Sequence, residues 1–505
     1  MKHRLFIFLI LCIYFNVTIF AQNGTISFFP AKGSKNVNLD TQLSITFQSE
    51  PTLGNKGTIR MYDVETHQLV DSLDLSIPPG PSEPDMIRKR QANYTSIPYK
   101  YETTDFTNAN TQPGTPSGLA IRDTANYQLT IIGRFTDGFH FYPVIIKGNT
   151  ARIYLHNNML EYGKDYYITV DKDVFSTANK DFQGISINDE WYFSTKDQKP
   201  FPDKRKLIVS ADGSGDFNTV QGCMDFIPDF SKDKWEVFIK NGEYEELVYF
   251  RNKSNVSIIG ENREGVTIHY ANNETFNPHP INIKTNEWPG TFPSRRAAFA
   301  ADNCYDLHFE NLTIMTTLKG QAEGLLIMGE RNRLKNVHII GSGDALQANG
   351  SVYLENCTID GDGDTILGRG PAFFNNCTLS SYGPFMWIRN TEANHGNVFL
   401  NCTFLGKDDR AVIARSPVNK GIGYPYAEAV LINCKLDNVP SVGWGEITGD
   451  TSNLHFWEYN SRSLDGSLID TSLRHPLSHQ LTKEKDMELI NKYSDPKFVL
   501  GWDPL

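Results

Sequence analysis

Asn336-Val337-His338-Ile339 is one copy of a short unit that recurs through the second half of the sequence: an asparagine, a small or apolar residue, a polar residue and an apolar residue. Copies of the unit begin at Asn255, Asn311, Asn336, Asn356, Asn376, Asn401 and Asn433. From Asn311 onward they are spaced by 25, 20, 20, 25 and 32 residues. One short strand in every 20 to 25 residues is typical of a solenoid, and the long 3.6-residue periods of helical repeats are missing. We therefore predict a parallel β-helix, in which each coil buries its apolar face only against its neighbours.

The cysteines fit the same repeat. Of the seven in the chain, Cys357, Cys377, Cys402 and Cys434 each directly follow the repeated asparagine. A thiol that returns at one structural position behaves as a small apolar core residue, so we expect a stack rather than disulfides. There is no Cys-x-x-Cys spacing, so we predict no zinc site.

The N-terminus has the layout of an export signal. Basic residues at positions 2 to 4 precede an apolar run from Leu5 to Phe15, and Ala21 offers a small residue for cleavage. The run is too short to span a bilayer, and no later segment looks transmembrane. We predict a signal peptide over residues 1–21 and an exported protein, which is periplasmic, cell-surface or extracellular.

The remaining chain of 505 residues is long enough for two domains. Residues 22–195 alternate apolar and polar residues in short strands, and the part from 158 to 167 resembles bacterial immunoglobulin-like domains. We predict a β-sandwich with a long insertion from about residue 78 to 126, a polar linker over residues 196–206, and the β-helix over residues 207–505. The formal net charge of −11 argues against nucleic acid as a partner, and we expect a monomer.

Stacking of coils converts sequence period into proximity. Asp344 and Asp364 each lie eight residues after a repeated asparagine, so both should occupy the same phase on neighbouring coils, about 4.8 Å apart. Gln321 falls near that phase one coil earlier, whereas Arg415 needs its loop to bring it there. The glycine-rich surroundings of both aspartates are equally compatible with simple turns. The spacing alone leaves these two interpretations open.

Several segments, in order, resemble the pectin methylesterase family over residues 207–505. They are 207–220, 239–246, 255–260, Gly320-Gln321-Ala322, Gly343-Asp344-Ala345-Leu346, Asp364-Thr365-Ile366-Leu367-Gly368, Ala414-Arg415-Ser416-Pro417 and Trp457-Glu458-Tyr459. The resemblance implies an all-β chain with a right-handed parallel β-helix that acts on pectic polysaccharide. It also implies the roles of four residues, and it implies that neither a metal nor a cofactor is needed.

In these roles Asp364 is the nucleophile that attacks the ester carbonyl, and Arg415 keeps it ionised and oriented. Asp344 is the acid that protonates the departing methanol and then the base that activates water. Gln321 donates a hydrogen bond to the tetrahedral oxyanion.

The sequence departs from the family in ways that affect the substrate site. Most members have a second glutamine directly before the acid/base aspartate, where this chain has Gly343; Gln347 is a candidate to compensate. The family tryptophan after the arginine is replaced by Ser416-Pro417. We name Trp387, Tyr382 and Trp444 as candidate platforms for stacking against the substrate.

Two other functions remain open from the sequence. Because Gly343 breaks the motif, the chain could be a non-catalytic or altered-specificity carbohydrate-binding relative. A pectate lyase or polygalacturonase also uses a parallel β-helix, and Asp360, Asp362 and Asp364 could imitate the calcium-binding acidic cluster of a lyase.

Overall fold

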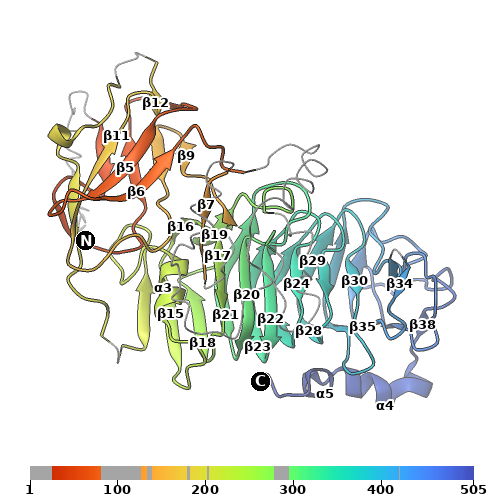
Figure 1. Cartoon of the computed structure of the whole chain (residues 1–505). Helices are drawn as coiled ribbons and strands as arrows, with labels where there is room; N and C mark the ends of the chain where they lie inside the picture. Colours follow the sequence, from red (N-terminus) through yellow and green to blue (C-terminus); the bar gives the residue numbers. More distant parts are fainter. Residues whose placement is uncertain are drawn as a thin grey trace, which may run out of the picture.

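The structure is a computed structural model that describes residues 26–80, 127–133, 139–178, 182–201, 204–277, 295–419 and 421–505. The predicted signal peptide, residues 1–21, and residues 81–126 of the predicted insertion lie outside the described residues. Figure 1 shows an N-terminal unit of strands at one end of a long stack of parallel strands. The stack is the β-helix that the repeat predicted, and it is right-handed.

The β-helix has three faces, of which two are joined at bent corners into one long sheet. Within the described residues, this long sheet has 17 strands in a single order. They are β14 (Lys206–Val209), β15 (Trp235–Ile239), β16 (Gly242–Glu245), β18 (Val256–Gly260), β19 (Val266–Tyr270), β21 (His308–Thr316), β23 (Asn332–Ile340), β25 (Val352–Glu355), β26 (Thr358–Asp360), β28 (Ala372–Asn375), β29 (Thr378–Ser381), β31 (Asn397–Leu400), β32 (Thr403–Gly406), β35 (Glu428–Ile432), β36 (Lys435–Asp437), β37 (His455–Tyr459) and β38 (His479–Gln480). The third face is a short sheet of β17 (Val248–Arg251), β20 (Phe299–Tyr305), β22 (Leu325–Glu330), β24 (Leu346–Ala348), β27 (Ile366–Gly368) and β30 (Met386–Ile388).

The repeated asparagines form one corner of the coils. Asn311, Asn336, Asn356, Asn376, Asn401 and Asn433 all have a positive φ, between 52° and 57°. Asparagine tolerates this left-handed conformation better than other residues with a Cβ. The corner is also a ladder of side chains, since Asn336 Nδ2 donates to Asn311 Oδ1 at 2.8 Å and Asn376 Nδ2 donates to Asn356 Oδ1 at 2.5 Å. The repeat therefore marks a turn that only a few residue types can make.

Asn255 belongs to a different corner, although its sequence unit looks the same. The register pairs Ser257 with His308, so Asn255 shares its phase with Asp306 rather than with Asn311. The sequence unit describes a polar residue at a left-handed bend before a strand, and this bend occurs at more than one corner of the coil.

The interior of the β-helix is a column of apolar side chains that includes the cysteines. Cys223, Cys304, Cys357, Cys377, Cys402 and Cys434 are all buried and free. The predicted stack is confirmed: the Cys377 backbone N–H lies 3.4 Å from Cys402 Sγ in the next coil.

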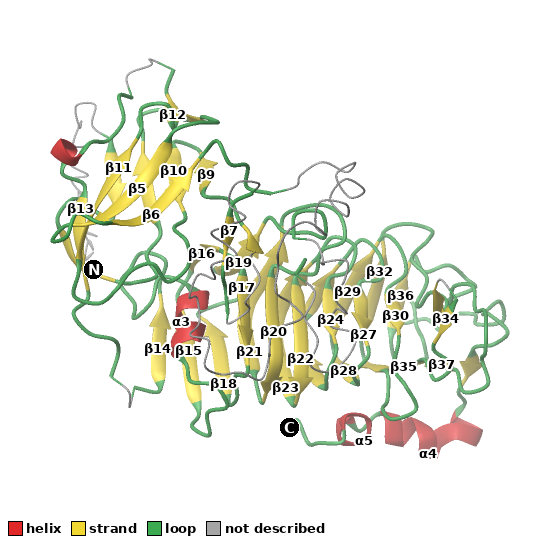
Figure 2. Ribbon diagram, viewed as in Figure 1, coloured by secondary structure: helices red, strands yellow, loops and turns green. Residues whose placement is uncertain are grey.

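Short helices cover one end and one side of the stack. Helix α3 (Val220–Phe226) closes the N-terminal end, and α4 (Lys483–Tyr493) and α5 (Pro496–Leu500) pack outside one face of the long sheet, at the bottom of Figure 2. None of the helices within the described ranges is long and apolar enough to cross a bilayer.

The N-terminal unit is a sandwich of two sheets around its own core. One sheet has the order β1 (Ser27–Phe29), β3 (Leu43–Thr46), β10 (Thr150–Ile153) and β9 (Val144–Lys147), and the other β2 (Ser34–Val37), β13 (Tyr192–Thr195), β11 (Asp165–Val170), β5 (Thr58–Asp63) and β6 (Leu69–Asp74). Smaller pieces are β4 (Thr52–Leu53) with β12 (Phe175–Ser176), β7 (Leu129–Thr130) with β8 (Phe139–His140), β33 (Val418–Asn419) with β34 (Ile422–Gly423), and a 3₁₀ turn at Ile187–Asp189. The immunoglobulin-like topology stays a prediction.

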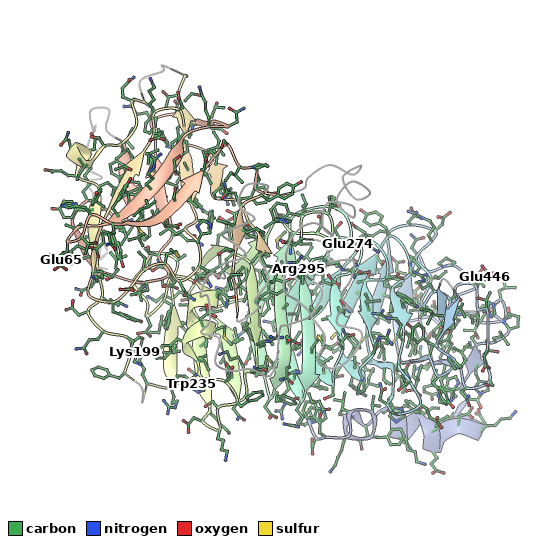
Figure 3. All side chains as sticks on the ribbon, in the orientation of Figure 1. Glu65, Lys199, Trp235, Glu274, Arg295 and Glu446 are labelled. Atoms are coloured by element: carbon green, nitrogen blue, oxygen red, sulfur yellow. The ribbon has the colours of Figure 1, made fainter. Side chains whose placement is uncertain are left out.

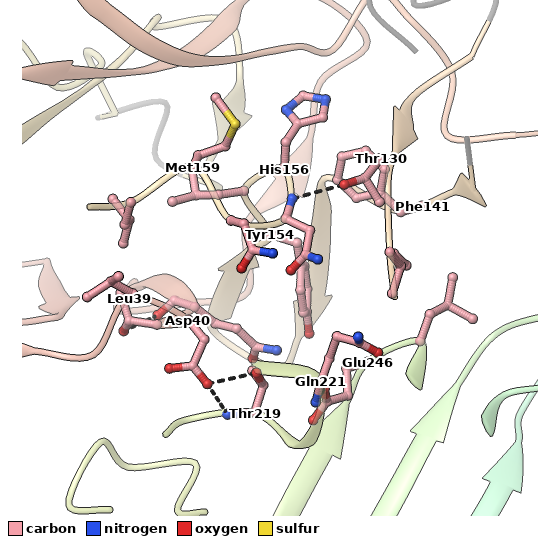
Figure 4. Close-up of a pocket in the computed structure, with 18 of the residues that line it drawn as sticks. Leu39, Asp40, Thr130, Phe141, Tyr154, His156, Met159, Thr219, Gln221 and Glu246 are labelled. Atoms are coloured by element: carbon pink, nitrogen blue, oxygen red, sulfur yellow. Dashed lines mark hydrogen bonds between the residues drawn. The ribbon is translucent and has the colours of Figure 1, made fainter. Parts of the chain in front are cut away.

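The sandwich is attached closely to the β-helix rather than tethered by a free linker. Asp40 of the sandwich accepts hydrogen bonds from the backbone N–H groups of Asn218 and Thr219 at the start of α3, at 2.9 and 2.7 Å. Figure 4 shows the contacts of Asp40 with Thr219. Glu246 of the β-helix accepts from the next two backbone N–H groups of the helix. In the predicted linker, Lys204 forms an ion pair of 2.5 Å with Asp216. A helix start that is capped from both units ties them together.

Replacing Asn376 tests whether the corner needs a left-handed residue. We expect Asn376→Ala to lower the free energy of unfolding by about 1–2 kcal/mol, because alanine is strained in this conformation. Asn376→Gly keeps the conformation and removes only the side-chain hydrogen bond, so it should lose less. Chemical denaturation of both variants measures the difference, and equal losses would contradict the argument.

Replacing Asp40 tests the attachment of the two units. We expect Asp40→Ala to cost about 1–2 kcal/mol of stability, since three donors at the start of α3 lose their acceptor. The matched control is Glu65→Ala, at an exposed carboxylate of the same unit. If both variants melt at the wild-type temperature, the cap does not stabilise the protein.

Candidate active site

The candidate site lies on the turns that lead from the long sheet into the short sheet. The register pairs Leu325 with Leu346 and Leu346 with Ile366. Glu323, Asp344 and Asp364 each lie two residues before one of these three positions, so they occupy equivalent places on three successive coils. The register therefore agrees with the predicted shared phase of Asp344 and Asp364. The spacing between strands places their backbones about 4.8 Å apart along the stack.

Asp364 is held by one of its two carboxylate oxygens. Arg415 Nη1 lies 2.8 Å from Asp364 Oδ2, whereas Oδ1 has no hydrogen-bond partner within the described part of the chain. The backbone of Asp364 has a φ of 45°, a strained conformation of the kind that collects at functional sites. Burial raises the pKa of Asp364, and the Arg415 guanidinium opposes that shift.

Arg415 reaches the site because the chain adds one more rung to the short sheet. A bridge pairs Ala414 with Met386, and Arg415 N donates to Met386 O at 3.1 Å. Arg415 therefore lies beside Trp387 on the outer side of this sheet, and its guanidinium covers the Trp387 ring at 4.8 Å from the ring centre. The ring keeps the guanidinium in place between Trp387 and Asp364.

Asp344 is buried, with only 5% of its surface exposed, and it faces a second arginine. Arg296 Nη2 lies 2.6 Å from Asp344 Oδ2 and 2.8 Å from Glu323 Oε1. Burial raises the pKa of Asp344 to about 7; Arg296 opposes the rise, and the carboxylates of Glu323 and Asp364 add to it. At neutral pH this carboxyl group is therefore close to half protonated.

Arg296 also binds Glu274 and Gln321. Its Nη1 lies 2.9 Å from Glu274 Oε2 and 3.3 Å from Gln321 Oε1. Glu274 lies at the upper rim of the β-helix in the view of Figure 3. Gln321 is exposed, and it belongs to the same turn as Glu323.

Gly343 stands where most family members have a glutamine, and its backbone explains the glycine. Its φ is +77°, in the left-handed region that favours glycine. A Cβ at this position would lie 3.3 Å from Gly320 O and 4.0 Å from Gln321 Cγ. A side chain at residue 343 would therefore be directed towards Gln321 from a strained backbone.

The structure separates the four candidate substrate-binding residues. Trp387 lies at the site beside Arg415, and Tyr382, 45% exposed, lies on the rim one coil beyond Asp362. Trp444 is a wrong prediction: it is fully buried in the β-helix core and stacks on Phe456 at 4.7 Å, so it cannot contact a substrate. Gln347 lies between Leu326 and Leu367 on the outer side of the short sheet and is buried, with its Oε1 unpartnered within the described residues.

The acidic residues that could imitate a calcium cluster have other partners. Asp360 binds His338 Nε2 at 2.7 Å, and Asp362 accepts from Ser342 Oγ at 2.9 Å and pairs with Lys319 at 3.4 Å. In the described parts of the chain, no three His, Cys, Asp or Glu side chains are grouped to hold a metal ion.

Sequence reasoning missed three charged residues of the site: Arg296, Glu323 and Arg389. Arg389 is buried, and its charge opposes the rise in the pKa of both Asp344 and Asp364. The available signal was a charged residue directly before an apolar strand. Arg296 precedes Ala297-Ala298-Phe299, just as Glu323 precedes the strand that starts at Leu325. The repeat was not visible there because a long segment interrupts it between Asn277 and Arg295.

This arrangement supplies the parts of acyl transfer. It has a carboxylate with one anchored and one unpartnered oxygen, and a second carboxyl group whose pKa permits it to give and take a proton near neutral pH. An amide side chain lies beside the second group and can donate to a developing oxyanion.

Comparison with known proteins agrees with this chemistry. The family model described as Pectinesterase matches residues 206–501. Among curated relatives, the probable pectinesterase/pectinesterase inhibitor 42 of Arabidopsis thaliana is 28% identical over 28% of this chain and 25% of its own length. Pectinesterase QRT1 of Arabidopsis thaliana is 28% identical over 59% of this chain and 78% of its own length.

Solved structures that match include pectin methylesterases. The carrot enzyme is 19% identical with a TM-score of 0.47, over 58% of this chain and 92% of its own. Pectin methylesterase PemA from Erwinia chrysanthemi is 20% identical with a TM-score of 0.45, over 61% of this chain and 99% of its own. Because the family model covers more than half of the sequence, including every residue of the candidate site, this chain belongs to the pectinesterase family.

Proposed function

We propose that this protein is a carbohydrate esterase that hydrolyses the methyl esters of galacturonosyl residues in pectic polysaccharide and releases methanol. The observation that carries the proposal is the pair of aspartates on adjacent coils with different surroundings. Asp364 is bound by Arg415 through one oxygen, and Asp344 is buried against Arg296 with a pKa near 7. Different environments assign different roles to two nearby carboxyl groups.

In the first half of the reaction, Asp364 Oδ1 attacks the ester carbonyl carbon and the carbonyl oxygen becomes an oxyanion. Gln321 donates a hydrogen bond to that oxyanion. The C–O bond to the methoxy group then breaks, and protonated Asp344 gives its proton to the leaving oxygen, so that methanol departs. The product is an acyl-enzyme, in which the sugar carboxyl group is joined to Asp364 as an anhydride.

In the second half, Asp344 is an ionised base. It takes a proton from water, the resulting hydroxide attacks the acyl carbon, and Asp364 leaves as a carboxylate. Asp344 is then protonated again, ready for the next ester. Arg415 stabilises the ionised form of Asp364 at the beginning and end of this cycle.

The surroundings of the pair support a polymeric sugar substrate. Trp387 and the exposed Tyr382 flank the site on the C-terminal side, and flat aromatic rings of this kind suit the faces of sugar rings. Arg415 and Arg389 both contact the Trp387 ring, so two cationic side chains lie beside this candidate platform. We also propose that the protein acts without a cofactor as a monomer, and that it is exported through residues 1–21, on the basic and apolar pattern of that segment.

Replacing the nucleophile tests the function. We expect wild-type protein to release methanol from methyl-esterified pectic polymers without new reducing ends or unsaturated products, and Asp364→Asn to lose several powers of ten in turnover. Thermal melting checks that the variant is folded. The matched control is Asp362→Asn, two residues away on the rim, which should stay near wild type.

Two results would contradict this role. Turnover by Asp364→Asn above about a tenth of wild type would exclude a covalent role, since the loss of a nucleophile normally costs far more. Unsaturated products, or loss of activity in Asp362→Asn together with a calcium requirement, would instead indicate a lyase.

The pKa of Asp344 predicts the pH dependence. Asp344 must carry a proton in the first step, and its pKa is raised to about 7, so the protonated fraction is high below that pH and falls above it. We expect kcat/KM for methanol release to fall about tenfold per pH unit on the alkaline side of neutrality. A rate that keeps rising through pH 9 would show that Asp344 does not act as the acid.

A further inference from the structure

Arg296 contacts four other polar side chains of the site. Its guanidinium contacts Asp344, Glu323, Glu274 and Gln321 at 2.6 to 3.3 Å. Glu323 is fully buried and accepts from Arg296 Nε with both oxygens, at 2.9 and 3.0 Å. The planar guanidinium is thereby fixed, and its two remaining nitrogens are directed at the acid/base carboxyl and at the oxyanion amide.

The contact with Gln321 fixes the orientation of that amide. A guanidinium has only N–H donors, so the group of Gln321 that faces Arg296 must be the carbonyl oxygen Oε1. The amide nitrogen Nε2, the part that can donate to an oxyanion, is then on the other side of the amide group. An amide without this contact could rotate, and half of its orientations would present an acceptor to the oxyanion.

Arg296 also contacts Gln321, the residue towards which a side chain at position 343 would be directed. A side chain at residue 343 would start 4.0 Å from Gln321 Cγ, and Gly343 has none. Arg296 comes to Gln321 and Asp344 from the preceding coil instead, three residues before β20. The site therefore has a cationic donor beside both groups although it lacks the glutamine.

We propose that Arg296 is a positioning residue for the esterase reaction, which holds Asp344 and the amide of Gln321 together in their reactive orientations. This inference rests on the proposed function. It assigns to Arg296, with Glu323 and Glu274 as its supports, the task of organising the proton-transfer half of the site, while Arg415 organises the nucleophile.

The charge of Arg296 acts on Asp344 within a crowded set of ionisable groups. Asp344 is faced by Arg296 and Arg389 and by the carboxylates of Glu323 and Asp364. If Arg296 is removed, the negative charges of Glu323 and Asp364 are opposed by Arg389 alone among these groups. The pKa of Asp344 should therefore rise, and Asp344 will keep its proton to higher pH. The alkaline limb of the pH–rate profile should then move upward by about one unit or more, while the rate in the plateau falls.

Three variants separate the charge of Arg296 from its geometry. Arg296→Gln removes both, whereas Arg296→Lys keeps a charge but cannot bind Asp344 and Gln321 together. The double variant Arg296→Gln/Glu323→Gln also removes the buried carboxylate of Glu323, which the single replacement would leave without its arginine. The matched control is Arg331→Gln, which breaks an arginine–carboxylate pair with Asp306 at another corner of the coil. Thermal melting checks that each purified full-length protein is folded. Methanol release from methyl-esterified pectin is then measured between pH 5 and 10, at intervals of about half a pH unit.

We expect kcat/KM of Arg296→Gln and of the double variant to fall about 100-fold. The alkaline limb should move to higher pH in Arg296→Gln, and by less in the double variant, because the Glu323 carboxylate that raises the pKa of Asp344 is removed as well. Arg296→Lys should lose rate with little movement of the limb, and Arg331→Gln should match wild type in both. If Arg296→Gln does not fold, the double variant decides. Folded protein lacking Arg296 that keeps the wild-type rate and limb would overturn the proposal. Wild-type protein that releases no methanol would instead refute the esterase function itself, and the inference with it.

Discussion

Backbone hydrogen bonds between successive coils keep each residue one strand spacing from its counterpart in the next coil, and the site depends on this constraint. Leu325, Leu346 and Ile366 are bonded neighbours in the short sheet, so the residues that precede them are neighbours as well. The charges of the site are thus brought together by a rigid parallel stack rather than by a flexible loop. A turn of constant length before each strand is sufficient to align Glu323, Asp344 and Asp364.

This alignment is electrostatically unfavourable by itself, because it places carboxyl groups in one row under a partly closed surface. The chain offsets it with arginines that arrive from different places. Arg296 comes from the coil before the row, Arg389 from the strand after it, and Arg415 from one further rung of the short sheet. The pairing is unequal, since Arg415 forms an ion pair with Asp364 at 2.8 Å, whereas Asp344 shares Arg296 with Glu323 and Glu274. The two aspartates therefore have different electrostatic surroundings, although they occupy equivalent backbone positions on successive coils.

The N-terminal sandwich contributes to the β-helix as well as preceding it. An open end of a β-helix exposes unpaired backbone and apolar interior, and α3 covers that end. Because Asp40 caps α3 and Phe139 packs against Tyr249 at a centroid distance of 4.6 Å, the end of the stack is completed by residues from both units. The pocket between them, lined by Asp40, Thr219 and Glu246, is part of this seam.

The sequence alone determined the architecture and the shared phase of the two candidate aspartates, because both follow from a period. The asparagine at each corner, the cysteine after it and the aspartate eight residues on are local features that repeat, and stacking converts them directly into neighbours. Only the tertiary structure decided which other side chains lie beside the two aspartates and which aromatic residues are exposed. Trp444 reads like an exposed aromatic in the sequence but packs inside the core, and Asn255 resembles the other repeats but turns a different corner. Arg296 lies outside the recognised repeat, and the sequence marks it only as a charged residue before an apolar strand. Its position beside Asp344 depends on packing between coils, which only the tertiary structure shows.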